Sequence, residues 1–397
     1  MTEQRVLIAG AGPVGLVAAA HLARAGVPVT VFEQGPRLSE ESRASTFHPP
    51  TLDMLHALGA AEPLIAQGLI CPTFQYRTKK YGLTAEFNFS AIADATGHPY
   101  RVQCEQSKLT RILYEQMRGH PNFELLFDSP VRAVSQTPSG VEVTIESPGG
   151  RETRAGRYLI GADGASSAVR RSLGIEFEGF TWPDRLLVIS TPFDFFSVIP
   201  GLSSVSYVAD PERWYFLLRV PGLWRAMFLV NEDASDERVQ TPEFAQSLMT
   251  GVIPGISNYE ISHTTLYKVH QRVARTFKLG RTFLIGDAAH INNPLGGMGM
   301  NGGVHDALNL VSKLEQVWHG GDSALLQLYE RQRRTVTLEA VQQQTMRNHQ
   351  LMSERDPEVR AKSFANLRET VADPAKAREY LLKSSMIMSL RRAESIQ

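Results

Sequence analysis

Three glycines at fixed spacing stand near the start of the chain. Gly10, Gly12 and Gly15 follow a short apolar run at residues 6–9, and an amphipathic helical pattern covers about residues 13–25. In such a turn the first glycine permits a tight change of direction. The second lets the main chain approach a pyrophosphate, and the third lets helix and strand pack closely. The helix N-terminus offers free N–H groups and a partial positive charge to the phosphates.

An acidic residue ends the next apolar run. Residues 29–32 form a second short apolar segment, and Glu33 follows it directly. A carboxylate at this distance from the glycines can accept hydrogen bonds from the ribose of an adenine nucleotide. Strand, glycines, helix and acid together predict a dinucleotide-binding βαβ unit. The alternative is a tight βαβ turn that binds no ligand.

Two further apolar runs end in glycine-rich turns that contain an aspartate. Residues 158–160 lead into a turn with Asp163, and residues 282–285 lead into a turn with Asp287. The carboxyl ends of parallel strands meet at one edge of a sheet, where α/β proteins bind their ligands. Residues 281–303 also contain six glycines. Glycine costs conformational entropy, so this density needs a structural reason.

Composition excludes several classes of protein. The chain has 397 residues, with 41 Lys and Arg against 41 Asp and Glu, so no overall charge attracts nucleic acid or an anionic membrane. No run reaches the roughly 18 apolar residues of a membrane span, and no signal peptide is expected. Cys71 and Cys104 lack the paired spacing of a metal site or redox motif, which favours a reducing, cytoplasmic location. The basic run at residues 331–334 is interpreted as the solvated face of a helix.

Three motifs together resemble one known family. They are the N-terminal glycine pattern, "GADGASSAVR" at residues 161–170 and "GRTFLIGDAAHINNPLGGMGMNGGVHDALNLVSKL" at residues 280–314. The chain resembles the class A flavoprotein aromatic hydroxylases of the p-hydroxybenzoate hydroxylase fold over roughly residues 4–335. The resemblance implies bound FAD, NADH or NADPH as electron donor, and transfer of one oxygen atom of O₂ to a phenolic ring through a flavin C4a-hydroperoxide. Partners would be the small aromatic substrate and O₂.

The resemblance also implies the FAD-binding residues. Arg43 would lie near the pyrophosphate, Gln106 on the flavin side, and Asp287 at the ribityl chain, while Asp163 would serve both FAD and the nicotinamide donor. The flavin ring would lie against main chain at the glycines before a helix that begins near Gly302. The full predicted set is Gly10, Gly12, Pro13, Val14, Gly15, Glu33, Gln34, Arg43, Gln106, Asp163, Gly286, Asp287, Gly297, Gly299, Met300 and Asn301.

The predicted catalytic residues are His48 and Pro294. A histidine with a near-neutral pKa could accept the proton of a phenol, although His48 could equally be a structural residue that holds the loop before two prolines. By resemblance, the Pro294 carbonyl faces the substrate. His290 is interpreted as a hydrogen-bonded packing residue, and no metal site is predicted.

A different pattern covers about residues 180–270. β-Rich segments flank Pro221 and Gly222, which predicts a hairpin in an antiparallel sheet. Strand residues alternate between faces, so either Trp214 and Phe216 or Tyr215 and Leu217 point inward. The resemblance implies that this sheet covers the substrate pocket. The predicted substrate contacts are Tyr207, Tyr215, Arg219, Pro294 and Gly296.

The predicted fold is α/β. Residues 1–178 and 268–335 would form a Rossmann-like FAD-binding domain with a mostly parallel sheet, residues 179–267 an antiparallel substrate-binding domain, and residues 336–397 a C-terminal helical segment. Two alternatives for function stay open. One is an FAD-dependent epoxidase or Baeyer–Villiger-type enzyme for polyketide-like substrates, and the other is a non-catalytic nucleotide-binding protein. The sequence is also compatible with a homodimer.

Overall fold

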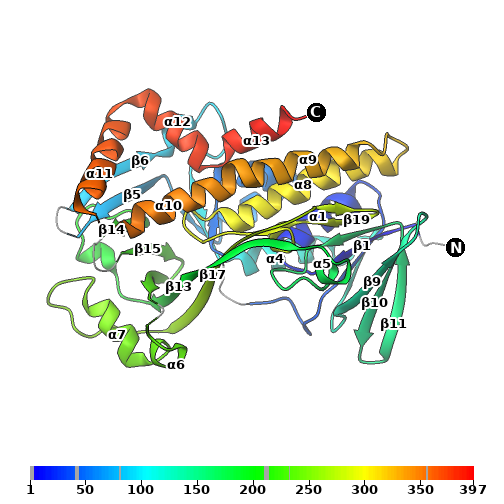
Figure 1. Ribbon diagram of the computed structural model, residues 1–397, viewed down its shortest axis with the longest axis horizontal. Coiled ribbons are helices and arrows are strands. Elements are labelled where there is room, and N and C mark those ends of the chain that lie inside the picture. Colours follow the sequence, from blue (N-terminus) through cyan, green and yellow to red (C-terminus); the bar gives the residue numbers. More distant parts are fainter. Residues whose placement is uncertain (1–3, 41–43, 80–81, 210–213, 232, 355) are drawn as a thin grey trace.

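A mostly parallel sheet forms one layer of the molecule (Figure 1). The structure, a computed structural model, describes residues 4–40, 44–79, 82–209, 214–231, 233–354 and 356–397, and within these ranges the sheet has six strands in the order β18–β19–β12–β1–β2–β8. Neighbours run parallel, except that β18 is antiparallel to β19. The strands are β1 (Val6–Ala9), β2 (Val29–Phe32), β8 (Phe123–Leu126), β12 (Tyr158–Gly161), β18 (Lys278–Leu279) and β19 (Thr282–Leu284). β1, β2 and β12 are buried along their whole length, as expected for a parallel sheet covered on both faces.

Helices from both ends of the chain cover this sheet. α1 (Pro13–Arg24) packs against α8 (Met298–Trp318) and against α4 (Gln106–Met117). A small antiparallel sheet extends from this layer at the lower right of Figure 1, formed by β9 (Val131–Gln136), β10 (Val141–Ser147) and β11 (Gly150–Gly156). The short helix α5 (Ala168–Ser172) packs on β9.

A second large sheet is almost entirely antiparallel. In the part of the chain that the structure describes, it has eight strands in the order β20–β17–β13–β16–β15–β14–β5–β6. They are β5 (Thr73–Thr78), β6 (Gly82–Asn88), β13 (Phe177–Thr191), β14 (Val205–Ala209), β15 (Tyr215–Val220), β16 (Leu223–Val230), β17 (His263–Ala274) and β20 (His290–Ile291). β15 and β16 form the predicted hairpin at residues 221–222. β5 and β6 join from far outside residues 179–267, so distant chain segments complete this sheet, and the predicted domain boundaries stay a prediction.

The two faces of this sheet pack against different helices. Trp214 and Phe216 belong to a cluster with Tyr207 that is covered by α11 (Pro357–Ala372) and α12 (Pro374–Ser384). Tyr215 and Leu217 point to the opposite face, which α7 (Pro242–Thr250) covers. The short helix α6 (Asp236–Val239) precedes α7.

A third, small antiparallel sheet has three short strands in the described part of the chain. It consists of β3 (Thr46–Phe47), β7 (Arg101–Gln103) and β4 (Leu69–Cys71). α2 (Pro49–Ala57) begins directly after β3, and α3 (Ala61–Ile65) follows α2. The 3-10 turn η1 (Phe89–Ile92) follows β6 and contacts α12.

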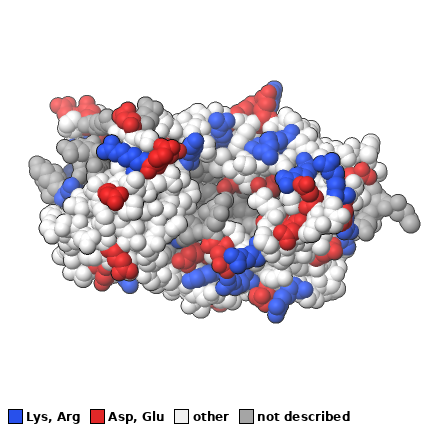
Figure 2. Space-filling view, turned by 90° about the horizontal axis from the view of Figure 1, so that it is seen from below, with Lys and Arg blue, Asp and Glu red and all other residues white. Residues whose placement is uncertain are grey.

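The C-terminal part is helical, as predicted. α9 (Leu325–Val336) runs beside α8, and the π-helical turn η4 (Thr337–Gln342) continues it into α10 (Gln343–Ser353) (Figure 1). α11 and α12 then turn back, and α13 (Ile387–Glu394) returns to α9. Within the described ranges, none of the helices combines the length and apolar character of a membrane span. Basic and acidic side chains are intermixed over the face in Figure 2, in agreement with the equal numbers of each.

Candidate functional site

The glycine turn after β1 leaves space in front of the α1 N-terminus. Gly10 has φ +101°, and a Cβ there would lie 2.5 Å from the Ala162 carbonyl oxygen. A Cβ at Gly15 would lie 2.1 Å from the Gly10 carbonyl oxygen. Packing therefore requires both glycines. At Gly12 no atom of the described chain lies within 4 Å of an added Cβ, although Gly12 is the N-cap of α1. Packing within the protein therefore does not require glycine at position 12. A pyrophosphate at the helix N-terminus would require it, because a side chain would block its approach to the main chain.

The acid after β2 is held beside this turn. One carboxylate oxygen of Glu33 accepts a hydrogen bond from the Ala11 N–H at 2.9 Å, and the other accepts one from the Gly35 N–H at 3.0 Å. Because a carboxylate has about four acceptor positions, Glu33 keeps capacity for the hydroxyls of a ribose. Gln34, the next residue, is exposed.

Two residues of the predicted FAD set have packing roles at the start of α1. Pro13 occupies its first turn, where its fixed φ suits a helix and its missing N–H costs nothing. The Val14 side chain fills the space beside Gly286 and Gly303, where an added Cβ would lie 3.2 and 2.6 Å from it. The close approach of α1, β19 and α8 therefore depends on these glycines.

The two aspartates at the ends of β12 and β19 lie in different environments. Asp163 accepts hydrogen bonds from the Ser167 hydroxyl at 2.5 Å and the Val169 N–H at 3.1 Å, so it also fixes the start of α5. Asp287 is exposed at the strand end. The two strand ends are adjacent, since the Ile285 N–H donates to the Gly161 carbonyl at 3.0 Å. The structure thus brings the predicted phosphate, ribose and ribityl contacts to one edge of the parallel sheet.

α8 begins one turn earlier than predicted. Its first residue is Met298 rather than a residue near Gly302, because Gly297 adopts a left-handed conformation, φ +66°, and caps the helix. A Cβ at Gly297 would lie 3.1 Å from the Thr46 side chain. Gly299 is half-buried in the first turn of α8, with Asn292 Oδ1 3.8 Å from its built Cβ. The helix N-terminus consequently lies against β3.

Asn301 locks α8 to the segment that carries His48. Its Oδ1 accepts from the His48 N–H at 2.9 Å, and its Nδ2 donates to the carbonyls of Thr46 at 2.8 Å and Gly297 at 2.6 Å. These hydrogen bonds use the side-chain amide within the protein, so Asn301 acts here as a positioning residue. Its neighbour Met300 is buried. Sequence reasoning identified both positions but not this bridge, because Thr46 and His48 are more than 250 residues away from Asn301.

His48 is fully buried and neutral. Its Nε2 lies 2.7 Å from the Gly296 carbonyl oxygen, which can only accept, so Nε2 carries the proton and Nδ1 is the acceptor. Nδ1 is buried and has no hydrogen-bond partner among the described residues. Burial lowers the pKa of His48 well below its ordinary value, and the positive charge of Arg101 lowers it further.

Arg101 is a buried cation that sequence analysis did not identify. It precedes Val102 in β7, and Val102 pairs with Phe47 next to His48, so the register brings Arg101 beside His48. Its guanidinium carbon lies 4.5 Å from the ring centre of Phe74. No carboxylate pairs with Arg101 among the described residues, and its Nε is buried without a partner there. A charge in this setting is costly unless a bound anion completes it.

Aromatic rings line the same region. Tyr76 and Tyr207 stack with ring centres 5.2 Å apart, and the Tyr76 hydroxyl lies 2.9 Å from that of Tyr380 on α12. Burial raises the pKa of Tyr380 to about 12, so both hydroxyls stay protonated. Leu295, from the loop before α8, packs in the same cluster. The predicted substrate contact Tyr207 therefore lies on the face of the sheet that meets the α8 loop.

Other predicted substrate contacts lie elsewhere. Tyr215 is on the opposite face with α7, and Arg219 stacks there on Phe196, 4.6 Å from its ring centre. The structure does not bring these two residues to Tyr207. The Pro294 carbonyl accepts the Gly297 N–H at 3.0 Å and so closes the turn before α8.

One further member of the predicted FAD set, Gln106, lies near the β3 segment. Gln106 is half-buried in the first turn of α4, and its N–H donates to the Ala44 carbonyl at 3.1 Å. Arg43 lies outside the described residues.

A buried charge network supports the α8 end of the site. Asp306 accepts from the Gly286 N–H at 3.1 Å, and it bonds His290 Nε2 and Arg333 Nε at 2.7 Å each. Burial alone would raise the pKa of Asp306, but the charges of His290 and Arg333 hold it below its ordinary value. The interpretation of His290 as a packing residue is confirmed. The interpretation of residues 331–334 as solvated is wrong at Gln332 and Arg333, which are buried, and Arg333 pairs there with Asp306.

Comparisons with known proteins agree with this geometry. The profile of the FAD binding domain family matches residues 3–344. The chain is 35% identical over 386 residues to the para-nitrophenol 4-monooxygenase of Pseudomonas sp. (strain WBC-3), covering 96% of this chain and 95% of that protein. It is 36% identical over 345 residues to the 6-hydroxy-3-succinoylpyridine 3-monooxygenase of Pseudomonas putida (strain DSM 28022 / S16), covering 85% and 86%. The crystal structure of p-nitrophenol 4-monooxygenase from Pseudomonas putida DLL-E4 superposes with a TM-score of 0.92 at 31% identity, covering 99% of each chain.

Proposed function

This chain belongs to the FAD binding domain family, and on that premise we propose that it is an FAD-dependent monooxygenase that hydroxylates a phenolic ring, with NADH or NADPH as electron donor. FAD, when bound, would supply the redox chemistry by which electrons from the nicotinamide and one oxygen atom of O₂ hydroxylate the ring, with the other oxygen atom leaving as water. The protein has to bind the cofactor, orient the ring, and exclude water.

The strand ends and two helix N-termini supply the groups that FAD needs. The space at Gly12 in front of α1 would take the pyrophosphate, Glu33 the ribose, and Asp287 the ribityl chain. The N-terminus of α8, capped at Gly297, would face the ring, where its partial positive charge favours a reduced, anionic cofactor. The left-handed Gly297 and its close approach to Thr46 explain why glycine stands there.

The observation that carries the proposal of a phenolic substrate is the buried pair His48 and Arg101. Arg101 is a cation without a carboxylate partner among the described residues, and His48 Nδ1 is an acceptor without a donor there. A phenol supplies both missing partners, because its O–H donates to His48 Nδ1, and when that proton passes to Nδ1 the phenolate that remains is stabilised by Arg101. The aromatic rings of Phe74, Tyr76 and Tyr207 form an apolar wall for the substrate ring.

His48 and Arg101 have different electrostatic roles in this proposal. Because burial and Arg101 lower the pKa of His48 well below its ordinary value, His48 is uncharged at neutral pH and accepts a hydrogen bond there. A cation within about 4–6 Å lowers an acid's pKa by roughly one to three units. Arg101 would therefore favour the phenolate, in which the ring carbons are more electron-rich and react more readily with an electrophilic oxygen.

The relatives indicate which ring carbon to examine. By name, one acts at position 4 of para-nitrophenol and the other at position 3 of 6-hydroxy-3-succinoylpyridine, and each position lies para to a ring hydroxyl. We therefore propose a phenol with a substituent para to the hydroxyl as substrate, with oxygen added at the substituted carbon. Addition ortho to the hydroxyl is the alternative outcome.

A panel of matched ring compounds tests the proposal. NADH and NADPH oxidation is measured with phenol, para-nitrophenol, a hydroxypyridine, a polyketide-like aromatic and para-nitroanisole, whose methyl ether can neither donate nor ionise. We expect free phenols to stimulate oxidation and yield an oxygenated product by mass, and the ether to do neither. Release of the para substituent distinguishes para from ortho attack. If no phenol both stimulates oxidation and gains oxygen, the proposal is wrong.

Two arginines stacked on aromatic rings provide a matched pair of variants. Arg101→Met should raise the pKa of bound para-nitrophenol, read from the absorbance of its phenolate, by about one unit or more and reduce kcat/KM at least about tenfold. Arg219→Met, on the opposite face of the sheet, should leave both unchanged. Equal effects of the two substitutions would contradict the assignment of Arg101.

We also propose where the protein is located in the cell and how many chains it contains. A cytoplasmic location is supported by Cys71 and Cys104, which are buried free thiols whose pKa burial raises to about 11. We also propose a homodimer, which sedimentation at micromolar concentration would test; a single monomeric species would exclude it.

A further inference from the structure

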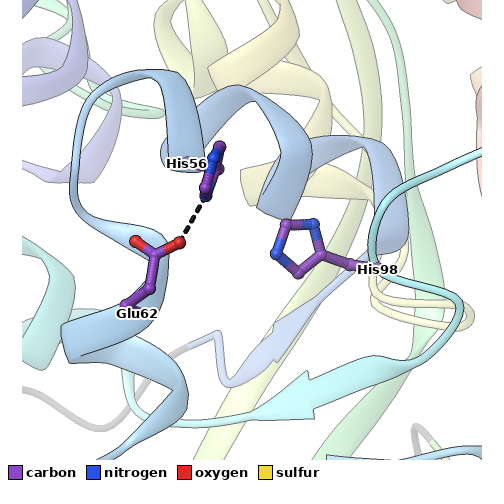
Figure 3. Close-up of side chains that lie close together, drawn as sticks. All are labelled: His56, Glu62 and His98. Atoms are coloured by element: carbon purple, nitrogen blue, oxygen red, sulfur yellow. Dashed lines mark hydrogen bonds and ion pairs between the residues drawn. The ribbon is translucent and has the colours of Figure 1, made fainter.

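Two histidines and a carboxylate converge at the end of α2 opposite to His48. His56 lies in the last turn of α2, Glu62 in α3, and His98 in the loop before β7, and their ligand atoms all lie within 4.8 Å of one another (Figure 3). His56 and Glu62 are exposed, whereas the His98 side chain is 13% exposed. Sequence analysis predicted no metal site, since this spacing matches no common motif.

A second carboxylate, that of Asp53, orients the His98 ring. Its Nδ1 lies 2.7 Å from Asp53 Oδ1, so Nδ1 carries the proton and Nε2 is left as the free acceptor. Figure 3 shows one ring nitrogen of His98 directed toward His56 and Glu62. Asp53 is itself fixed, because it accepts from the Gly97 N–H at 3.1 Å and the Thr96 hydroxyl at 2.6 Å. A carboxylate that fixes the tautomer of a histidine is the usual outer partner of a metal-bound imidazole.

The remaining two groups already share a proton that a metal ion would replace. His56 Nδ1 and Glu62 Oε1 form a close hydrogen bond. Tetrahedral ligands about 2.1 Å from zinc lie about 3.4 Å apart, so the longest separation in the cluster has to shrink by about an ångström, while the hydrogen-bonded atoms of His56 and Glu62 have to move apart. Exposed side chains such as His56 and Glu62 can provide both movements by rotation.

We propose that His56, Glu62 and His98 bind one zinc ion, with Asp53 orienting His98 and water completing the coordination. Two imidazoles and one carboxylate are a ligand set that zinc favours. The alternative to a zinc site is a cluster of surface ion pairs that binds no metal. The bound ion would join α2, α3 and the loop before β7, and therefore link the two segments that carry His48 and Arg101. The ion would stabilise the segments that carry His48 and Arg101 without contacting the reacting atoms.

Metal content is measured on the FAD-loaded protein after chelator treatment and dialysis against micromolar ZnCl₂. We expect about one zinc ion per wild-type chain and at least a tenfold weaker affinity in Glu62→Gln and His98→Gln. His21→Gln is the matched control, because His21 forms another His–Glu pair, 2.8 Å from Glu315, outside any such three-residue group among the described residues. This variant should bind zinc like wild type.

Two further measurements separate a built site from loose surface binding. Co²⁺ should give the visible absorption of a four-coordinate ion beyond the flavin bands in wild type and His21→Gln, and not in His98→Gln. Zinc should raise the unfolding temperature of wild type by about 2 °C or more, since a ligand of the native state stabilises it, and should leave Glu62→Gln unchanged. Equal zinc content and equal shifts in wild type and Glu62→Gln would overturn the proposal. Neither readout depends on hydroxylase activity.

Discussion

Replacing Gly12 by alanine should separate cofactor binding from folding. Gly12 has φ −69° and ψ 177°, which any residue adopts, and no atom of the described chain lies within 4 Å of an added Cβ. The FAD-free protein should therefore tolerate Gly12→Ala, or gain about 0.4–1 kcal/mol from the lower entropy of its unfolded state. Gly15→Ala differs, because its Cβ would lie 2.1 Å from a main-chain oxygen and should prevent correct folding.

The expected loss of FAD affinity follows from the hydrogen bonds at the α1 N-terminus. The new methyl group would occupy the space through which the pyrophosphate reaches the free N–H groups of α1. Losing one hydrogen bond to a charged group costs about 1.5–3 kcal/mol. That range corresponds to a Kd for FAD about 10- to 150-fold higher than in wild type. The change lies outside the uncertainty of a fluorescence titration.

The assay compares the same two quantities in three proteins. Apo-protein stability is measured by urea denaturation, and the Kd by quenching of FAD fluorescence. Gly119→Ala is the control, because an added Cβ at Gly119, just after α4, also meets no described atom within 4 Å. It should match Gly12→Ala in stability and wild type in Kd. An unchanged Kd for FAD in Gly12→Ala would refute the placement of the pyrophosphate. A loss of apo-protein stability in Gly12→Ala that Gly119→Ala does not show would indicate that the fold itself requires Gly12.

Three further outcomes depend on buried polar groups. Asn301→Asp places a carboxylate oxygen next to two carbonyl oxygens that now lie 2.6 and 2.8 Å from the amide nitrogen. The free energy of unfolding, measured by urea denaturation, should fall by about 3 kcal/mol or more. A fall of less than about 1 kcal/mol would contradict the bridging role of Asn301. Burial and the charge of Arg333 lower the pKa of His305 to about 3, and His48 is lowered too, so both are neutral when folded and charge below about pH 6.5 when unfolded. Stability should thus be complete above pH 6.5 and fall toward pH 3, by up to about 1.4 kcal/mol per pH unit for each histidine; an unchanged urea midpoint between pH 7 and 5 would contradict this. Arg333→Met leaves a buried aspartate short of a cation and should cost about 3–5 kcal/mol, against less than about 0.5 for the exposed Arg331→Met; similar losses would show that the buried pair contributes little.

Local features were predictable because they depend on neighbours in the chain. Strand, glycines, helix and Glu33 form one continuous segment whose turn geometry demands glycine at Gly10. The hairpin at residues 221–222 and the strand β19 before the turn of Asp287 follow from similar short patterns. Residue types and spacing over 5–34 and 280–314 were sufficient to indicate the family, and the family profile confirms it.

Tertiary structure decided which face of each element points inward. Alternation divided β15 into two faces, but only the packing of α7 and α12 shows that Tyr215 lies away from Tyr207. The sequence around Arg333 predicted a solvated side chain, but Asp306 on α8 forms a buried ion pair with it. The position of Arg101 beside His48 follows only from the pairing of β7 with β3. A residue's type and its neighbours along the chain limit the contacts it can make. The contact it does make depends on which distant segment folds against it, because burial and charge pairing act through space.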